Sequence, residues 1–178
     1  SCPSVAILPA EMSKERFEWL KTMAEEVIAT PGCESNVKEI FDKCVEIEKT
    51  RPDAVIFNQF DQLPNHLWHH TITGPAMDEV FGKLKGAKGH LALAMFSSGS
   101  AGTLGAGSYL KQQHKGTRVG VGEALQCPTI LENGFGGHRI EGIGDKHIPW
   151  IHNLRDTDIA VGVDDEITIR LLRLFNEP

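Results

Sequence analysis

The sequence has no long apolar run, no excess of positive charge and no recognisable targeting segment. A membrane-spanning helix needs roughly 18 or more consecutive apolar residues, and no stretch of the 178 residues approaches that length. Lysine and arginine number 18 against 24 acidic residues, which gives a formal net charge of −6. Nucleic acids and anionic membranes are recognised by basic surfaces, so we expect neither as a partner. Residues 1–13 lack the positive start and extended apolar core of a secretory signal, which favours a cytoplasmic protein.

Closely spaced cysteine pairs and zinc-protease histidine pairs are absent as well. The four cysteines form no C-x-x-C pair, so zinc ribbons and thioredoxin-type redox sites are not indicated. Free thiols, as in reducing compartments, are the expected state. The segment 66–70 (HLWHH) places two histidines four residues apart, but Leu67 stands where an H-E-x-x-H metalloprotease has glutamate. We therefore expect no bound metal.

The chain does contain a regular alternation of short apolar strands and amphipathic helices. Strands are predicted at 4–8, 26–30, 53–58, 90–96, 117–122 and 158–163. Helices are predicted at 13–24, 35–47, in the stretch ending at 84, at 103–115 and at 164–175, with N-caps at Ser13, Ser35 and Asp164. Alternation of this kind predicts an α/β fold with mostly parallel sheets. The stretch 123–150 is predicted to be irregular.

Six small residues, SSGSAG at 97–102, separate a predicted strand from the helix that begins at 103. The N-terminus of a helix has unpaired N–H groups and a dipole that favours negative charge. Gly99 and Gly102 allow close approach to the main chain, and twelve of the 18 glycines lie between 99 and 144. We expect a phosphate at this loop, with a tight turn that packs the helix against the sheet as the alternative.

Three phosphate-binding motifs were compared with this loop. The P-loop requires Gly-Lys-Ser/Thr, whereas Thr103 and Leu104 follow Gly102 here, so that interpretation fails. A dinucleotide-binding loop is closer, because Glu123 lies about 20 residues on, where an acid would bind ribose. However, the glycines do not give G-x-G-x-x-G. The third motif is the phosphate cradle of fold type II enzymes that use pyridoxal 5'-phosphate (PLP).

Five segments, in order, resemble the cysteine synthase and tryptophan synthase β family of fold type II PLP enzymes. They cover nearly the whole chain, at 6–32, 57–80, 97–113, 118–131 and 138–151. The loop SSGSAGT resembles the family's GTGGT phosphate loop, and FNQFDQLPNHLWHHTITGP resembles its QF…N…TGP segment. HRIEGIGDKHIP is similar to the family's HKIQGIGAGFIP.

The resemblance implies a three-layer αβα architecture with parallel sheets, divided between two lobes. Residues 1–58 would form part of the small mobile lobe, and residues 59–178 part of the large PLP-binding lobe. The cofactor phosphate would be held by the backbone of Gly99, Ser100, Ala101, Gly102 and Thr103. Ala101 replaces the family's usual glycine, and we expect its amide to remain a donor if φ is negative there.

The resemblance also assigns the substrate and ring sides of the site. Gln59 would bind the substrate carboxylate, and Gly142 and Gly144 would leave room for the cofactor ring. The segment 145–147 (Asp-Lys-His) departs from the small or aromatic residues of the family, which predicts a more polar substrate pocket. An exposed loop histidine is the favoured interpretation of His147, and a side chain facing the ligand is the alternative.

The family's Schiff-base lysine has no counterpart among the eleven lysines of the sequence. In the family it lies in an SxKxR segment well before the region that matches residue 6. Lys146 is the one lysine expected near the cradle. We therefore expect the middle of a longer enzyme that acts on a small amino acid by β-elimination or β-replacement. It would form a homodimer or associate with the missing parts. A non-catalytic subunit that binds phosphate or a partner is the alternative.

Overall fold

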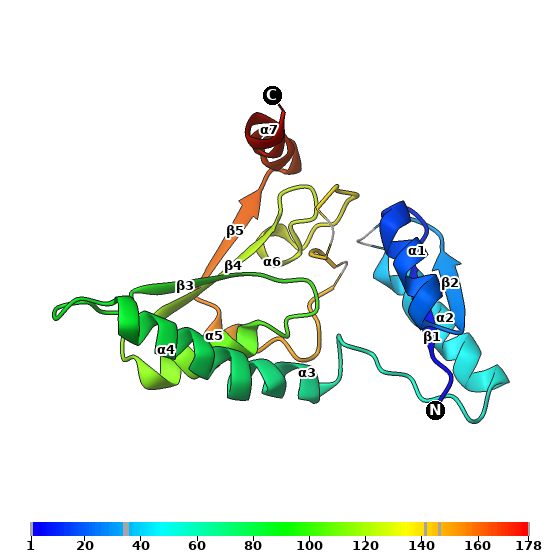
Figure 1. Cartoon of the computed structure of the whole chain (residues 1–178), viewed down its shortest axis with the longest axis horizontal. Helices are drawn as coiled ribbons and strands as arrows, with labels where there is room; N and C mark the ends of the chain where they lie inside the picture. Colours follow the sequence, from blue (N-terminus) through cyan, green and yellow to red (C-terminus); the bar gives the residue numbers. More distant parts are fainter. Residues whose placement is uncertain (1, 34–35, 141, 146, 178) are drawn as a thin grey trace.

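The secondary structure alternates strands and helices, and the strands form two parallel sheets (Figure 1). The computed structural model describes residues 2–33, 36–140, 142–145 and 147–177. One sheet has two strands and the other has three. The α/β class and the parallel pairing expected from the sequence are confirmed. A connection without regular structure links the two sheets, and we call residues 2–58 the N-terminal part and residues 59–177 the C-terminal part.

The N-terminal part is a two-stranded parallel sheet with two helices. Strand β1 (Val5–Pro9) pairs with β2 (Glu26–Thr30), and α1 (Lys14–Met23) connects them. Helix α2 (Val37–Thr50) follows and contacts both strands. The predicted cap is confirmed for α1, where the Ser13 side chain accepts a bond from a first-turn amide. The cap predicted for α2, at residue 35, lies outside the described residues.

The predicted strand at 53–58 is wrong. This segment has no regular structure, and Val55 and Phe57 are 73% and 84% exposed. Its composition is that of a strand, but within the described residues no strand lies beside it to complete a hydrogen-bonded ladder. β-propensity reflects packing on neighbouring strands rather than an intrinsic preference of the backbone, so the apolar run remains a connection.

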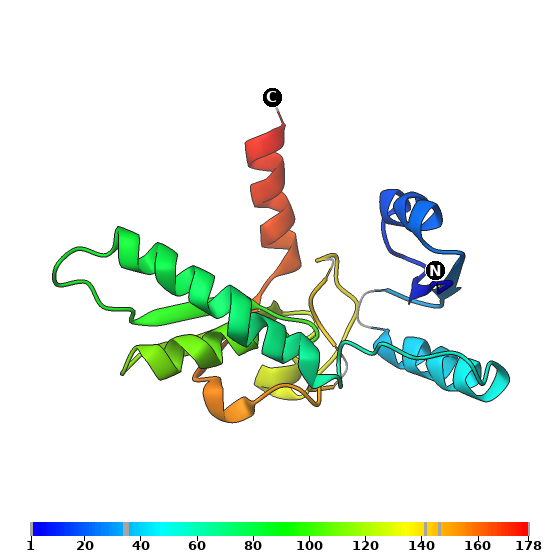
Figure 2. The ribbon, with the colours of Figure 1, turned by 60° about the horizontal axis from the view of Figure 1, so that its bottom comes forward.

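A long helix begins the C-terminal part. It consists of α3 (Leu63–Trp68), a π-helical turn η1 (His69–Thr73) and α4 (Gly74–Leu84). Gly74 and then Pro75 follow the π turn, and proline cannot donate the usual helical hydrogen bond. The π-helix is rare and occurs mostly as a single turn inside an α-helix, frequently at functional sites. The helix runs alongside α5, as Figures 1 and 2 show.

The larger sheet has the order β3-β4-β5, with all strands parallel. Its strands are β3 (Leu93–Ser97), β4 (Arg118–Ala124) and β5 (Ile159–Val163). Helix α5 (Leu104–Gln113) connects β3 to β4 and packs against both strands. The small-residue loop therefore lies at the carboxyl edge of the sheet, where ligands of open α/β folds bind.

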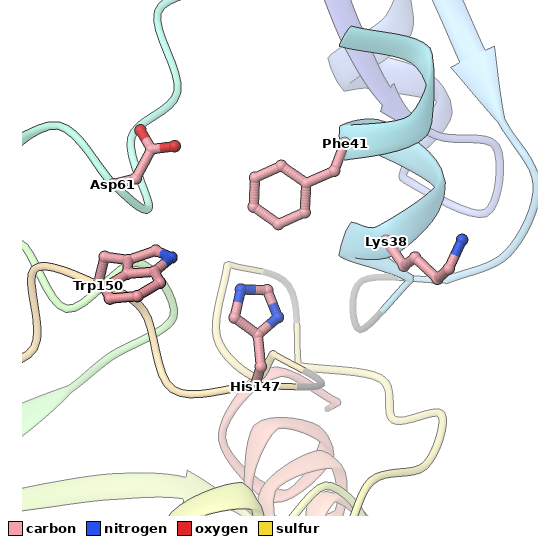
Figure 3. Close-up of a pocket in the computed structure, with 5 residues that line it drawn as sticks. All are labelled: Lys38, Phe41, Asp61, His147 and Trp150. Atoms are coloured by element: carbon pink, nitrogen blue, oxygen red, sulfur yellow. The ribbon is translucent and has the colours of Figure 1, made fainter. Parts of the chain in front are cut away.

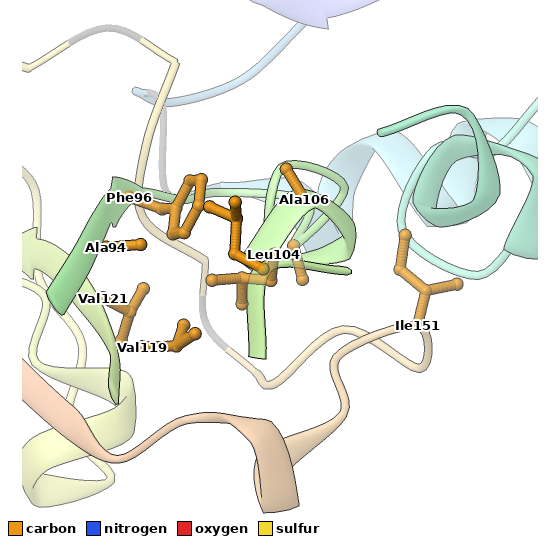
Figure 4. Packing of buried hydrophobic residues seen from close by; sticks show 9 residues of the cluster. Ala94, Phe96, Leu104, Ala106, Val119, Val121 and Ile151 are labelled. Atoms are coloured by element: carbon orange, nitrogen blue, oxygen red, sulfur yellow. The ribbon is translucent and has the colours of Figure 1, made fainter. Parts of the chain in front are cut away.

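The main core lies between this sheet and α5 (Figure 4). Pairing places Ala94 beside Val119 and Phe96 beside Val121, so these four side chains share one face. Three side chains of α5 pack on that face, namely Leu104, Ala106 and Leu110. Complete burial of Val119, Val121 and Leu110 makes this the best-packed region of the described chain.

The opposite face of the same sheet is open. Leu93, Met95, Val161 and Val163 are 40–46% exposed. Successive strand residues point to opposite faces, and parallel sheets normally have both faces covered. Within the described residues, this face has no covering helix that buries it.

Three short or terminal elements complete the fold. Helix α6 (Thr129–Glu132) lies within the stretch predicted to be irregular, and η2 (Leu154–Asp156) is one 3-10 turn before β5. Helix α7 (Asp165–Asn176) ends the described chain, and the predicted cap is confirmed, because Asp164 accepts a bond from a first-turn amide. Among the described residues, none of the helices has both the length and the apolar character needed to span a membrane.

Candidate functional site

The loop between β3 and α5 presents a run of backbone amides that the fold does not use. Within the described residues, the amides of 99–103 donate no hydrogen bond, whereas those of Leu104 and Gly105 already donate to carbonyls of the loop. Thr103 occupies the N-cap position of α5, but its side chain makes no capping bond. Open amides at a helix N-terminus attract an anion. The predicted phosphate loop has the required donors.

The backbone at Ala101 differs from what the sequence led us to expect. Its φ is +65°, in the left-handed region, although the side chain is buried. The expectation that φ of Ala101 stays negative was therefore wrong. A left-handed residue does not lose its N–H, and a left-handed turn within a run of amides is the geometry of an anion-binding nest. The cost for a residue other than glycine is about 1–2 kcal/mol.

Asn65 joins two of the predicted site segments, and the sequence interpretation had assigned it no role. Its Nδ2 donates to the backbone oxygen of Gln59 at 2.9 Å and to Oγ of Ser100 at 3.2 Å. A Cβ added at Gly102 would lie 2.2 Å from its Oδ1. Gly102 is therefore required by the close approach of Asn65. The sequence signal that could have identified Asn65 is the asparagine of the QF…N…TGP segment.

The third predicted segment lies directly against the loop. A Cβ added at Gly99 would lie 3.0 Å from the carbonyl oxygen of Gly142. Gly144 has φ +87°, and a Cβ there would lie 2.3 Å from Nε2 of His138. The structure thus brings together the three segments predicted around Gln59, the phosphate loop and the second glycine loop. The side chain of Gln59 is exposed, so it is not part of the packed core.

A small inner pocket lies behind the loop. Its lining includes Ser98, Gly99, Gly144, Asp145 and His147. The carbonyl of Asp145 accepts bonds from the hydroxyl of Thr129 and from Sγ of Cys127, which fixes the second glycine loop from below. Cys127 is thus a buried thiol that bonds to the second glycine loop, and none of the four cysteines, all of them among the described residues, forms a disulfide.

Glu123 also lines this pocket, but it is not arranged to bind ribose. It is buried, and its two carboxylate oxygens accept bonds from the amides of Ile130 and Leu131, each at 2.9 Å. These amides belong to the first turns of α6, whose N-terminus the carboxylate caps. The acid that favoured a dinucleotide site is therefore already used within the fold.

Most of the histidines near the loop make bonds within the fold or are buried in it. His69 bonds to Thr73 within the long helix, and His70 bonds to Gln112 of α5. Among the described residues, no group of three or more His, Cys, Asp or Glu side chains is placed to hold a metal ion. Burial lowers the pKa of His66, His138 and His152 below the ordinary histidine value.

His147 lies between the inner pocket and a larger outer pocket, and it lines both. Its Nδ1 is 3.3 Å from Oδ1 of the buried Asp145, and its ring packs against Phe41 of α2 at 5.4 Å between centroids. The residue is exposed, as the favoured interpretation expects, and that a ligand faces it stays a prediction. Lys146, the lysine expected near the cradle, lies outside the described residues.

Comparisons with known proteins point to one group of enzymes. The chain is 32% identical to a probable cysteine synthase of Bacillus subtilis over 168 residues, which is 92% of this chain and 51% of that protein. No family model matches the chain. The chain spans about half the length of the curated relatives it matches.

Solved structures give the same result in three dimensions. A hydrogen sulfide-producing enzyme of Fusobacterium nucleatum has a TM-score of 0.85 at 26% identity, with 94% of this chain and 50% of that chain covered. An O-acetylserine dependent cystathionine beta-synthase of Helicobacter pylori has a TM-score of 0.79 at 25% identity, with 97% and 55% covered.

Proposed function

By sequence and by fold, the chain belongs to the cysteine synthase-like family of fold type II PLP enzymes, and on this premise we propose that it contributes to PLP-dependent chemistry at the β-carbon of an amino acid. The reaction class is elimination or replacement of a β-substituent. The observation that carries the proposal is the run of open amides at 99–103, next to the two other segments expected at such a site.

The residues present fit the phosphate of PLP. Gly99, Ser100, Ala101, Gly102 and Thr103 would hold it through their amides, with the positive end of the α5 dipole behind them. Gly142 and Gly144 would leave the ring side open, and a side chain at Gly144 would collide with His138. When bound, PLP supplies an electron sink that makes the α-proton of an amino acid acidic.

Gln59 is the proposed contact for the carboxylate of the amino-acid substrate. Its backbone is held by Asn65, which also contacts Ser100, so its position is coupled to that of the phosphate loop. We expect Gln59→Ala to weaken binding of an amino-acid substrate about tenfold to a hundredfold, because a hydrogen bond to a charged group is lost. Gln113→Ala, at the exposed end of α5, is the matched control. Equal effects of the two changes would remove Gln59 from the site.

We further propose that residues 1–58 belong to a small lobe and residues 59–178 to a large one. The division is supported by the two separate sheets. The open face of the larger sheet supports association with another chain or with further parts of the enzyme. Helix α7 also carries exposed apolar side chains, among them Leu171 and Phe175. Apolar patches of this kind mark interaction surfaces.

The proposal is tested by comparing PLP with pyridoxal, which lacks the phosphate. PLP should bind the chain at least about tenfold more tightly, since charge-assisted bonds to several amides are the source of affinity. Equal affinity for the two compounds would contradict the phosphate assignment. Phosphate binding without any contribution from the ring would instead favour the alternative, a non-catalytic subunit.

A second experiment concerns the lysine. We expect that borohydride reduction in the presence of PLP labels no single lysine stoichiometrically, because most of the lysines lie on exposed surfaces where their ammonium groups are solvated. Labelled lysines are mapped by mass spectrometry. Stoichiometric labelling of one lysine together with turnover of an amino acid would show that the chain supplies its own Schiff-base lysine.

A further inference from the structure

The outer pocket has features that the phosphate loop and Gln59 do not explain. It lies between the N-terminal and C-terminal parts and has a volume of about 430 Å³. Its lining is shown in Figure 3 and consists of Lys38, Phe41, Asp61, His147 and Trp150. The volume is within the range of about 300–1,000 Å³ that is usual for small-molecule sites. A hydrosulfide ion, which is only slightly larger than a water molecule, would occupy a small fraction of it.

The lining is suited to a positively charged group. Phe41 and Trp150 present aromatic rings to the pocket from two different elements, and the carboxylate of Asp61 lies nearby (Figure 3). Trp150 is 87% exposed, so the fold does not use its ring for packing. Asn58 donates to Oδ2 of Asp61 at 2.9 Å and fixes that carboxylate. Aromatic faces and a carboxylate together are the usual receptor for an ammonium group.

Among the described residues that line the pocket, Lys38 is the one lysine or arginine, and its charge does not oppose ammonium binding. Lys38 is paired with Asp42, one turn along α2, which raises the pKa of Lys38 through their hydrogen bond. Figure 3 shows its amine pointing away from the rings of His147 and Trp150. The charge of Lys38 is therefore compensated outside the pocket.

His147 connects this pocket to the inner one. One of its ring nitrogens, Nδ1, faces the buried Asp145 at 3.3 Å. The other ring nitrogen faces the space between Phe41 and Trp150 (Figure 3). With the proton of a neutral ring on Nδ1, this second nitrogen accepts a hydrogen bond. His147 and Asp61 thus offer two acceptors to a donor in the pocket.

We propose that the outer pocket binds the ammonium group of a second substrate, so that the nucleophile is a thiol-bearing amino acid rather than hydrosulfide. The inference rests on the proposed β-replacement chemistry, which needs a nucleophile. The carboxylate of Asp61 lines the space, and the charge of Lys38 is already paired with Asp42, so an anion such as hydrosulfide gains no attraction there. An α-ammonium group matches the rings of Phe41 and Trp150 and the acceptors of Asp61 and His147.

The test is a titration of the ¹⁵N-labelled chain, with the indole N–H signal of Trp150 as the readout. L-Homoserine is the probe, 4-hydroxybutyrate is the same molecule without the ammonium group, and sodium hydrosulfide is the competing nucleophile. We expect a saturable shift with L-homoserine and at least about tenfold weaker binding of the other two. An equal response to 4-hydroxybutyrate, a response to hydrosulfide alone or no response at all would overturn the proposal.

Variants locate the binding group. Asp61→Asn keeps the size and removes the charge, and should weaken L-homoserine about tenfold. Phe41→Leu should weaken it about threefold, as expected for one aromatic face at an exposed site. Asp53→Asn, an equal change of charge at an exposed position outside the pocket, should have no effect. An unchanged affinity in Asp61→Asn with normal circular dichroism would contradict the assignment.

The two proposals fail in different ways. The phosphate loop is measured by PLP against pyridoxal, and the outer pocket by L-homoserine against 4-hydroxybutyrate. PLP binding without an ammonium effect would overturn the pocket assignment alone. An ammonium effect without PLP binding would overturn the proposed function, and the site would no longer belong to a PLP reaction.

Discussion

Two neighbouring stretches of small residues have almost the same composition and opposite roles. Residues 97–102 (SSGSAG) end a strand and form an open loop, and residues 104–108 (LGAGS) form the first turns of α5. In the helix, neighbouring atoms occupy the space that a side chain at Gly105 or Gly107 would need. A Cβ at Gly105 would lie 2.2 Å from the carbonyl of His66, and one at Gly107 would lie 3.0 Å from Phe96 and Val119.

Side-chain space is also restricted in the loop, where a Cβ at Gly102 would lie 2.2 Å from Asn65, so the loop differs from the helix in its main chain. Its five amides at 99–103 donate no bond within the described residues. Small residues allow close packing of α5 in one stretch, and in the other they leave backbone amides without a hydrogen bond within the described residues. Packing explains the helix stretch, and phosphate binding is the function proposed for the loop. The predictions below separate them.

The largest effect is expected in the packed stretch. Gly105→Ala places a methyl group against the backbone oxygen of His66, which cannot move without shifting α3. We expect the free energy of unfolding to fall by about 3 kcal/mol, at the upper end of overpacking costs. Urea denaturation measures it. Gly82→Ala in α4, where nothing lies within 4 Å, should instead stabilise by about 0.5–1 kcal/mol. Equal effects at the two positions would contradict the packing role.

The next effect is on binding by the loop. Gly102→Asp adds bulk against Asn65 and a negative charge where a phosphate would bind. PLP affinity should fall at least about tenfold to a hundredfold, the loss associated with charge-assisted bonds. Fluorescence titration measures it. Gly86→Asp, at a glycine with open space around it, is the control and should bind PLP normally. Retained affinity in Gly102→Asp would exclude the loop as the phosphate site.

A smaller effect concerns the second glycine loop, which rests on His138. Burial lowers the pKa of His138 in the folded chain. The unfolded chain then binds more protons, so the free energy of unfolding should decrease as pH falls below about 6.5. His66 and His152 act in the same direction. His138→Gln should flatten this dependence when urea midpoints are compared at pH 7.5 and 5.5. A profile as steep as in the unchanged chain would contradict the role of His138.

The smallest effect is expected at Ala101. Ala101→Gly removes a left-handed cost of about 1–2 kcal/mol and adds about 0.4–1 kcal/mol of unfolded-state entropy. Loss of the buried methyl group of Ala101 costs about 0.8 kcal/mol more, so the net change should be close to zero, with PLP binding retained. Ala106→Gly loses an equally buried methyl group without relieving a left-handed residue, and should destabilise by about 1–2 kcal/mol. Equal losses at both positions would contradict the left-handed cost at Ala101.

The sequence predicted most of the strands and helices, because their apolar periodicity corresponds to real packing faces. The strand at 53–58 failed for the converse reason. Its residues have strand composition, but Val55 and Phe57 find no neighbouring strand in the described chain. Helix α6 was missed because its capping group, Glu123, lies six residues before its first residue and acts only through the folded main chain.

The sequence located the three segments of the candidate site, but it did not predict how they are arranged in space. Glycine patterns and the family resemblance located 99–103 and 142–144, whereas their contact depends on tertiary structure. Asn65 was missed because a single asparagine in a helix does not indicate that it bonds to Gln59 and Ser100. The left-handed Ala101 could not be foreseen, since its conformation opposes the preference of the residue.

The most direct test of the central claim is residue-resolved titration of the ¹⁵N-labelled chain with PLP. The account predicts that the amide signals of residues 99–103 shift with one common saturation curve. The signals of Gly105 and Gly107, whose stretch is packed rather than open, should shift much less. Saturable shifts centred on the packed stretch or elsewhere in the chain, with residues 99–103 unchanged, would contradict it.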